Sequence, residues 1–262
     1  MKYIVIDPVI LDLGIVKIHW YGVMYLLAFL IAYLLAKYRA NLSQDWSTKQ
    51  IDDLIFYGAL GAVLGGRFGY MVFYSFPGFI ANPLIFLDFQ NGGMSFHGGF
   101  LGVLLAMLLF NRKSKKSFFQ TTDFIAPLVP LGLLFGRIGN YINAELWGKV
   151  TTSAWGIYAP DQSGMWAQRY PTQLFEALLE GVVLFLILWL FSQKNRPLMA
   201  TSSLFLIFYG FFRFIIEFIR VPDSQLGYLA FEWLTMGQLL SFPMFVVGLY
   251  LFYRSYYSEK KL

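Results

Sequence analysis

Residues 20–37 read WYGVMYLLAFLIAYLLAK, and this stretch decides the class of fold. Every side chain before Lys37 is uncharged, and most are aliphatic or aromatic. A helix of about 20 apolar residues crosses the ~30 Å hydrocarbon core of a bilayer, because each residue adds about 1.5 Å. The stretch therefore predicts a transmembrane helix.

Apolar blocks of similar length recur along the chain, separated by short polar stretches. Of the 262 residues, 58% are hydrophobic, 20% aromatic and 13% charged, and this charged share is about half that of a soluble domain. We predict an all-α integral membrane protein, a single polytopic domain over residues 1–262 with about seven transmembrane helices. The candidate spans are 20–37, 52–73, 94–110, 121–141, 172–191, 199–219 and 236–253.

The distribution of lysine and arginine predicts the orientation of the chain. Loops on the cytoplasmic side of a membrane carry an excess of basic residues. The loops after the first, third, fifth and seventh spans carry twelve, which predicts an outside N-terminus and a cytoplasmic C-terminus. The twelve are Lys37, Arg39, Lys49, Arg112, Lys113, Lys115, Lys116, Lys194, Arg196, Arg254, Lys260 and Lys261, against Lys2, Lys17, Lys149, Arg169 and Arg220 on the other side.

Three longer segments fall on the predicted outer side, at about 74–93, 142–171 and 220–235. They are rich in Gly, Pro and Trp, so we expect them to form a small periplasmic head. Before Lys17, the chain places Asp7, Pro8 and Asp12 where a signal peptide needs an apolar core. We therefore expect a retained segment that lies at the membrane interface.

The composition also excludes several kinds of chemistry. The chain has no cysteine and two histidines, and we see no clustered carboxylate motif, so we expect no disulfide, no thiolate nucleophile and no metal site. No P-loop and no G-x-S-x-G motif is present, and we expect no cofactor. The net charge of +5 lies in loops beside apolar blocks, which does not favour a nucleic-acid partner.

Glycines recur three or four residues apart in two of the candidate spans. They are Gly58, Gly61, Gly65 and Gly69 in the second span and Gly132 and Gly136 in the fourth. Small residues at this spacing let helix backbones approach closely. The alternative is that they leave room for a lipid or for a neighbouring arginine.

Three arginines fall within candidate spans, at Arg67, Arg137 and Arg213. A charge at the centre of a span costs about 2.5–3.5 kcal/mol on insertion scales, so such residues usually have a function. Arg67, between glycines, and Arg213 have the alternative of reaching an interface with their long side chains.

Arg137 and Arg213 each stand on a polar face of their helix. Arg137, Asn140 and Tyr141 are spaced i, i+3 and i+4, and Tyr209, Arg213 and Glu217 are spaced i, i+4 and i+8. Glu217 has the simpler alternative role of neutralising Arg213. Two guanidinium groups from different helices that face one cavity would hold a phosphate, and the phosphates nearest to a membrane protein belong to lipids.

His97 lies in the glycine-rich run GGMSFHGG, residues 92–99. Flanking glycines permit unusual backbone angles and close approach of a ligand. A lone histidine is commonly structural. On the same side of the membrane as two arginines, however, an imidazole is a candidate general base.

The run GRIGNYINAELWG, residues 136–148, resembles the signature of the bacterial prolipoprotein diacylglyceryl transferase family. The His97 run, the Trp20-Tyr21-Gly22 start and the stripe from Tyr209 to Glu217 are also similar, and the resemblance covers essentially the whole chain. It implies transfer of the diacylglyceryl group of phosphatidylglycerol to the lipobox cysteine thiol of a preprolipoprotein, the first step of bacterial lipoprotein maturation. The products are a thioether and glycerol phosphate.

The resemblance also implies where the site and the protein lie. The expected partners are phosphatidylglycerol, the preprolipoprotein signal peptide and other membrane lipids, in the bacterial cytoplasmic (inner) membrane with the active site toward the periplasm. The expected catalytic residues are His97, Arg137 and Arg213. The expected substrate-binding residues are Tyr21, Arg137, Asn140, Glu145, Gly148, Tyr209 and Glu217.

Alternatives remain open at the level of sequence. Either His97 removes the thiol proton, or it positions lipid while Arg213 lowers the thiol pKa. A transporter whose arginines line a path would show internal repeats and broken helices, and we find no convincing repeat. A protein that only captures anionic lipid would explain Arg137 and Arg213 but not the motifs around His97 and Asn140.

Substitution separates the two steps of this mechanism. His97→Gln is expected to keep lipid binding and lose most of the transfer, whereas Arg137→Ala is expected to weaken both. Lipid binding and product release are measured on the purified variants. Wild-type transfer by His97→Gln would eliminate the general-base role.

Overall fold

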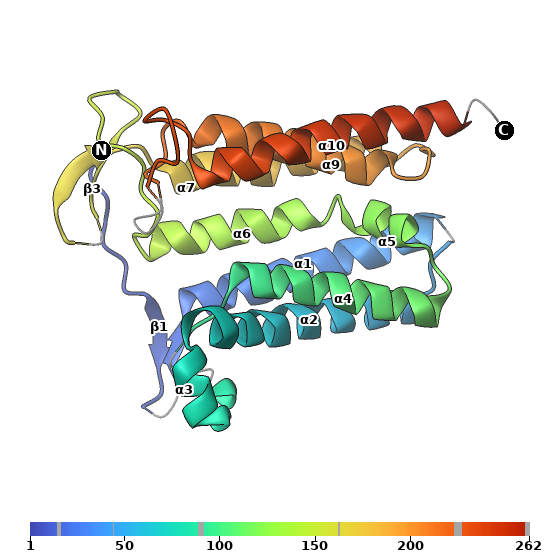
Figure 1. The fold of residues 1–262 in the computed structure, drawn as a ribbon, viewed down its shortest axis with the longest axis horizontal. Helices are drawn as coiled ribbons and strands as arrows, with labels where there is room; N and C mark the ends of the chain where they lie inside the picture. Colours follow the sequence, from blue (N-terminus) through green and yellow to red (C-terminus); the bar gives the residue numbers. More distant parts are fainter. Residues whose placement is uncertain (15–16, 44, 89–91, 162, 223–226, 260–262) are drawn as a thin grey trace. The chain divides into compact units, whose positions relative to one another are not determined.

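The computed structural model describes residues 1–14, 17–43, 45–88, 92–161, 163–222 and 227–259, and their fold is mainly helical (Figure 1). The chain divides into two compact units, one of Met1–Ala32 with Thr122–Leu262 and the other of Tyr33–Thr121. The predicted cytoplasmic residues Lys260 and Lys261 lie outside the described residues.

Each of the seven candidate spans coincides with helix. The helices are α1 (Trp20–Ser43), α2 (Thr48–Tyr74), α3 (Phe76–Ala81), η1 (Pro83–Leu87), α4 (Phe96–Ser114), α5 (Phe118–Ile125), α6 (Val129–Ile142), α7 (Thr172–Glu176), η2 (Ala177–Val183), α8 (Leu184–Phe191), α9 (Ala200–Ile216) and α10 (Met236–Glu259). Among the described residues, four are long and apolar enough to cross a membrane: Trp20–Ser43, Thr48–Tyr74, Thr172–Phe191 and Met236–Tyr257. The chain is therefore a helical membrane protein.

The predicted span 121–141 is not one straight helix. α5 and α6 together pass the same test of length and hydropathy, but they are bent by 50° at a short break. Pro127 and Pro130 stand at this break. Proline removes a backbone donor and disfavours helical angles in the residue before it, so two prolines at this spacing interrupt the helix.

In the unit of Tyr33–Thr121, α2 and α4 lie side by side (Figure 1) and meet through glycines. A Cβ added at Gly65 would lie 2.5 Å from the carbonyl oxygen of Gly98, and one at Gly102 would lie 2.1 Å from that of Gly61. Tight packing is confirmed for Gly61, Gly65 and Gly69, but not for the other three glycines of the prediction. Among the described residues, a Cβ at Gly58, Gly132 or Gly136 would meet nothing within 4 Å.

In the other unit, α9 and α10 also lie side by side (Figure 1). Gly210 of α9 faces the backbone of α10, where an added Cβ would lie 2.8 Å from the Ser241 carbonyl oxygen. Leu184 and Leu188 of α8 are fully buried and pack with Phe212 of α9. These contacts fix α9, which carries Arg213, against its neighbours.

Two small antiparallel sheets add to the helices. β1 (Val9–Asp12) pairs with β2 (Lys17–His19), and β3 (Ile157–Pro160) pairs with β4 (Trp166–Arg169). The chain start joins the second sheet, because Tyr3 N–H donates to the Tyr158 carbonyl at 2.9 Å. The pKa of Asp161, just after β3, is lowered. The largest cause is the hydrogen bond that the Ser163 hydroxyl donates to its carboxylate.

The α2–α4 packing predicts the effect of a single methyl group. Gly102→Ala is expected to lower the free energy of unfolding by about 1–3 kcal/mol, because backbone atoms cannot make room for it. Gly58→Ala is the matched control in α2, where the space is open and alanine favours helix. Thermal unfolding in detergent measures both, and equal melting temperatures would contradict the close packing.

Candidate functional site

The centre of the site is a pair of carboxylates inside the most apolar span. Glu176 ends α7 and Glu180 lies in η2, and both are fully buried in a span whose mean hydropathy is 2.3. η2 has the wider turn of a π-helix, a feature that often marks functional positions in helices. A buried carboxylate must be paired, so these two residues call for cations from other helices.

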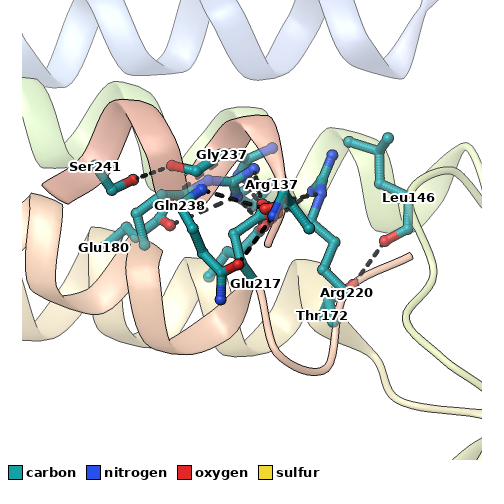
Figure 2. Close-up of polar contacts among 12 residues, drawn as sticks. Arg137, Leu146, Thr172, Glu180, Glu217, Arg220, Gly237, Gln238 and Ser241 are labelled. Carbon is teal, nitrogen blue, oxygen red and sulfur yellow. Dashed lines mark hydrogen bonds and ion pairs between the residues drawn. The ribbon is translucent and has the colours of Figure 1, made fainter. Parts of the chain in front are cut away.

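Three arginines converge on Glu176. Arg137 of α6 places Nε 2.9 Å from Glu176 Oε2, and Arg220 places Nη1 3.0 Å from Oε1. Arg213 of α9 pairs with the same Oε1 atom through its Nη1. Figure 2 shows this cluster, in which Arg137, Arg220, Glu180 and Glu217 are labelled.

Glu217 supplies the third negative charge of the cluster. Its Oε1 atom lies 2.6 Å from Arg213 Nη2 and 3.6 Å from Arg220 Nε. The sequence-based alternative, that Glu217 neutralises Arg213, is thus observed as an ion pair. Arg213 is held from two sides, by Glu176 at one terminal nitrogen and by Glu217 at the other.

Glu180 is placed differently from the other two carboxylates. Its oxygens lie 3.7 Å from Arg137 Nη2 and 3.8 Å from Arg213 Nη1, longer than a hydrogen bond. Within the described part of the chain, neither oxygen of Glu180 accepts a hydrogen bond. Glu180 therefore acts on the two arginines mainly through its charge.

The turn after α6 holds a second group of predicted residues. Asn140 Nδ2 donates to Glu145 Oε2 at 3.1 Å, and Asn143 Nδ2 donates to Oε1 at 3.3 Å. Ala144 and Leu146 have positive φ angles of 57° and 59°, which few residues other than glycine adopt. Such a turn persists only where its surroundings fix it.

Hydrogen bonds from two directions fix this turn. The Thr172 hydroxyl donates to the Leu146 carbonyl at 2.7 Å (Figure 2), and the Gln173 amide donates to the Glu145 carbonyl. Gly148 has no room for a side chain, because a Cβ there would lie 2.6 Å from the Ile219 carbonyl oxygen. The start of α7 and the end of α6 are thereby locked together.

Tyr21 and Tyr209 stand beside these groups. The Tyr21 ring covers Gly139, where an added Cβ would lie 2.7 Å from the ring. Tyr209 lies one turn before Arg213 on α9 and stacks on Phe205, with ring centroids 5.5 Å apart. Tyr21 therefore packs on α6, which carries Arg137, and Tyr209 lies on α9 with Arg213.

His97 belongs to the unit of Tyr33–Thr121, whereas the arginine cluster belongs to the other unit. It is exposed in the first turn of α4, beside a cavity of about 450 Å³ lined by Phe73, Tyr74, Ser95 and His97. The Ser95 hydroxyl accepts the Gly98 N–H at 3.3 Å and caps this helix. His97 therefore has space beside it for a ligand.

Arg67 lies in the same unit as His97, and its side chain is used locally. It is buried, and its guanidinium donates to the carbonyls of Phe86 and Gly93 at 3.0 Å. Further bonds reach Ile85 and Asp88 at 2.5 Å. Arg67 thus binds backbone carbonyls just before and at the start of the His97 run.

Comparison with known proteins gives one consistent answer. The family model described as prolipoprotein diacylglyceryl transferase matches residues 8–254. A protein from Pseudomonas fluorescens is 53% identical over 259 residues, which cover 98% of this chain and 96% of the relative. A protein from Solidesulfovibrio magneticus is 55% identical over 249 residues, with 95% and 94% covered. Both are named phosphatidylglycerol–prolipoprotein diacylglyceryl transferase.

The chain belongs to the prolipoprotein diacylglyceryl transferase family. A third member, from Coxiella burnetii, is 53% identical over 257 residues and covers 98% of both chains. The match over nearly the whole chain confirms the resemblance drawn from the signature run of residues 136–148.

Sequence reasoning missed part of the site of this transferase-family chain. It found no clustered carboxylates, but the structure brings Glu176, Glu180 and Glu217 together. The available signal was two glutamates four residues apart in an otherwise uncharged span. Arg220, assigned to an outer segment, is buried and binds Glu176.

Loss of the central carboxylate of the arginine cluster has a predictable cost. Glu176→Gln is expected to lower the free energy of unfolding by about 3–5 kcal/mol, because the buried Arg220 and the largely buried Arg137 and Arg213 would keep only two carboxylates. Unfolding in detergent, followed by tryptophan fluorescence, measures it. Asp12→Asn is the control, since its 3.3 Å pair with Lys17 is exposed and screened by solvent, so its loss is expected to leave stability nearly unchanged. Equal stability of both variants would contradict the central role of Glu176.

Proposed function

We propose that this protein transfers the diacylglyceryl group of phosphatidylglycerol to the lipobox cysteine thiol of a preprolipoprotein. The observation that carries the proposal is the convergence of Arg137 and Arg213, from two different helices, on one buried carboxylate. The relatives named above supply the two substrates, since their name includes phosphatidylglycerol and prolipoprotein. The chain has no cysteine of its own, so the sulfur comes from the substrate.

The reaction is a displacement at a glycerol carbon. The thiol sulfur forms a bond to this carbon while the bond from the carbon to the phosphate oxygen breaks, and glycerol phosphate leaves. The thiol gives up its proton, and the leaving phosphate gains a second negative charge. The protein must therefore provide a route for the proton and cations for the phosphate.

Arg137 and Arg213 hold the lipid phosphate in this proposal. Their side chains are 18% and 14% exposed, whereas that of Glu176 is fully buried. Part of each arginine side chain is thus accessible to a ligand, while Glu176 and Glu217 bind other parts of these side chains. Stabilisation of the second phosphate charge is worth about 3–4 kcal/mol per preorganised donor. Glu176 and Glu180 keep the charge of the arginines balanced when no phosphate is bound.

Other residues bind or activate the substrates. His97 takes the thiol proton, in keeping with its exposure beside a cavity. Asn140 at the end of α6, with Glu145 and Gly148 just after it, forms one fixed side of the binding site through hydrogen bonds and close packing. Tyr21 and Tyr209 orient the headgroup through their hydroxyls, next to α6 and α9. No cofactor is part of this proposal.

We further propose how the chain sits in the bacterial cytoplasmic membrane. It crosses seven times as one polytopic domain, with the N-terminus outside and the C-terminus in the cytoplasm. The bias of basic residues supports this orientation. The segments at 74–93, 142–171 and 220–235 form a periplasmic head, and the active site faces the same side.

A direct assay tests the activity. Purified protein in detergent, given phosphatidylglycerol and a lipobox peptide, is expected to release glycerol phosphate and to raise the peptide mass by one diacylglyceryl group. A peptide with serine in place of cysteine is expected to give neither signal. Lipid binding without release, in well-folded protein, would favour capture or transport instead.

Within this assay, Arg213→Lys is expected to lower kcat by about 10²–10³-fold, because an ammonium cannot replace a two-pronged guanidinium. Arg196→Lys is the matched control, an exposed arginine in the loop after α8. Its kcat is expected to stay within about twofold of the wild type, as for a surface change. Equal rates of the two variants would remove Arg213 from the phosphate site.

A further inference from the structure

The first turn of α10 lies directly against the Glu217 carboxylate (Figure 2). We propose that Thr235 and Gly237 are positioning residues of the transferase, which set the guanidinium of Arg213 by fixing Glu217. This inference rests on the proposed function, in which Arg213 holds the lipid phosphate.

The Thr235 hydroxyl is committed to Glu217. It donates to Glu217 Oε2 at 2.6 Å and accepts the Gln238 N–H at 3.2 Å. The Gln238 side chain in turn accepts the Thr235 N–H at 3.0 Å, which completes a capping box. A hydroxyl has one proton to donate, and here its acceptor side is fixed by the helix. Its proton therefore points at Glu217.

Gly237 is needed for space. A Cβ at this position would lie 2.5 Å from the carboxyl carbon of Glu217 and 2.6 Å from Oε1. The carboxylate thus rests on the backbone of the first helical turn, where free N–H groups and the helix dipole favour a negative charge. Any side chain at Gly237 must push the carboxylate away from this place.

The position of Glu217 passes directly to Arg213. Glu217 Oε1 lies 2.6 Å from Arg213 Nη2, and Glu217 is only 4% exposed. A displaced carboxylate in this buried cluster has no bulk water to replace its bonds. Arg213 would then keep Glu176 alone as a close partner, and its guanidinium would turn away from the geometry that receives phosphate.

The first test replaces Gly237 and compares it with a neighbour. Gly237→Ala is expected to lower kcat/KM for phosphatidylglycerol on the order of 10–100-fold, as removal of residues that orient a charged group does elsewhere. Ser241→Ala is the matched control: it loses one 2.6 Å bond to the Gly237 carbonyl in the same helix and does not bind Glu217. Its kcat/KM is expected to stay within about twofold, because the contacts of the Glu217 carboxylate with Thr235 and Gly237 are unchanged.

Two conservative substitutions of Thr235 test the inference even if the Gly237→Ala variant does not fold. Thr235→Ser keeps the hydroxyl and is expected to retain most activity, whereas Thr235→Val keeps the shape and is expected to lose it. A purely structural role would lower the melting temperature of Thr235→Val and leave kcat/KM of the folded fraction unchanged. That result would overturn the inference.

A double-variant cycle shows whether Gly237 acts through Glu217. In a Glu217→Gln background, Gly237→Ala is expected to lower kcat/KM by less than about a third of the factor by which it lowers kcat/KM in the wild-type background. The reason is that the effects of coupled residues are not additive. Equal losses in both backgrounds would overturn the inference.

Binding of phosphatidylglycerol to the purified protein separates this inference from the proposed function. If the wild type binds the lipid but does not transfer it, the proposed function fails. The inference then stands if Gly237→Ala binds at least about tenfold more weakly than Ser241→Ala, the lower end of the range given above. It fails if the two bind equally. A wild type that does not bind the lipid would overturn both.

Discussion

The ion pairs of Glu176 are the constraint on which the rest of the site depends. Arg137 of α6 meets Arg213 of α9 and Arg220, just after the end of α9, at this one carboxylate, which is fully buried. In a bilayer such charges are tolerated only in company, since each alone would cost several kcal/mol. The need to pair them therefore dictates how α6, α7 and α9 pack, and the same pairing holds two guanidinium groups ready for an anion.

Packing between small residues makes this arrangement possible. Leu134 of α6 packs so closely on Gly181 that a Cβ added to the glycine would lie 2.8 Å from the leucine side chain. The backbone of α10 packs on Gly210 in the same way. Lipid chains are as apolar as leucine, so close backbone contact replaces the hydrophobic effect as a reason for helices to associate. The strained turn at Ala144 and Leu146 is stable for a related reason, because Thr172 and Gln173 bind its carbonyls.

Much of the fold was predictable because the bilayer leaves a chain few choices. Every backbone donor in hydrocarbon needs an internal partner, so an apolar block becomes helical, and helices cover most of each block, although 121–141 is divided between two bent helices. The break at Pro127 was missed because hydropathy averages over residues and does not register a lost donor. Within the site, Arg137, Arg213 and Asn140 were found because polar residues in apolar blocks stand out. Glu176 and Glu180 are also charged residues in an apolar block, but they were overlooked. The role of Gly237 could not be read from the sequence, because it depends on the contact with Glu217 in the folded protein.

The sequence by itself determined the class of protein, the helical segments and the family, since hydropathy and a local motif are properties of neighbouring residues. Apart from the pair of Arg213 with Glu217, one turn apart on the same helix, only the tertiary structure decided which charges meet. The bonds that Glu176 makes with Arg213 and Arg220 join residues 37 and 44 positions apart. Such partners are chosen by the packing of whole helices, where the cost of an unpaired buried charge selects one arrangement among many. The neighbours of Glu217 were settled in the same way, by the place where α10 begins beside the end of α9.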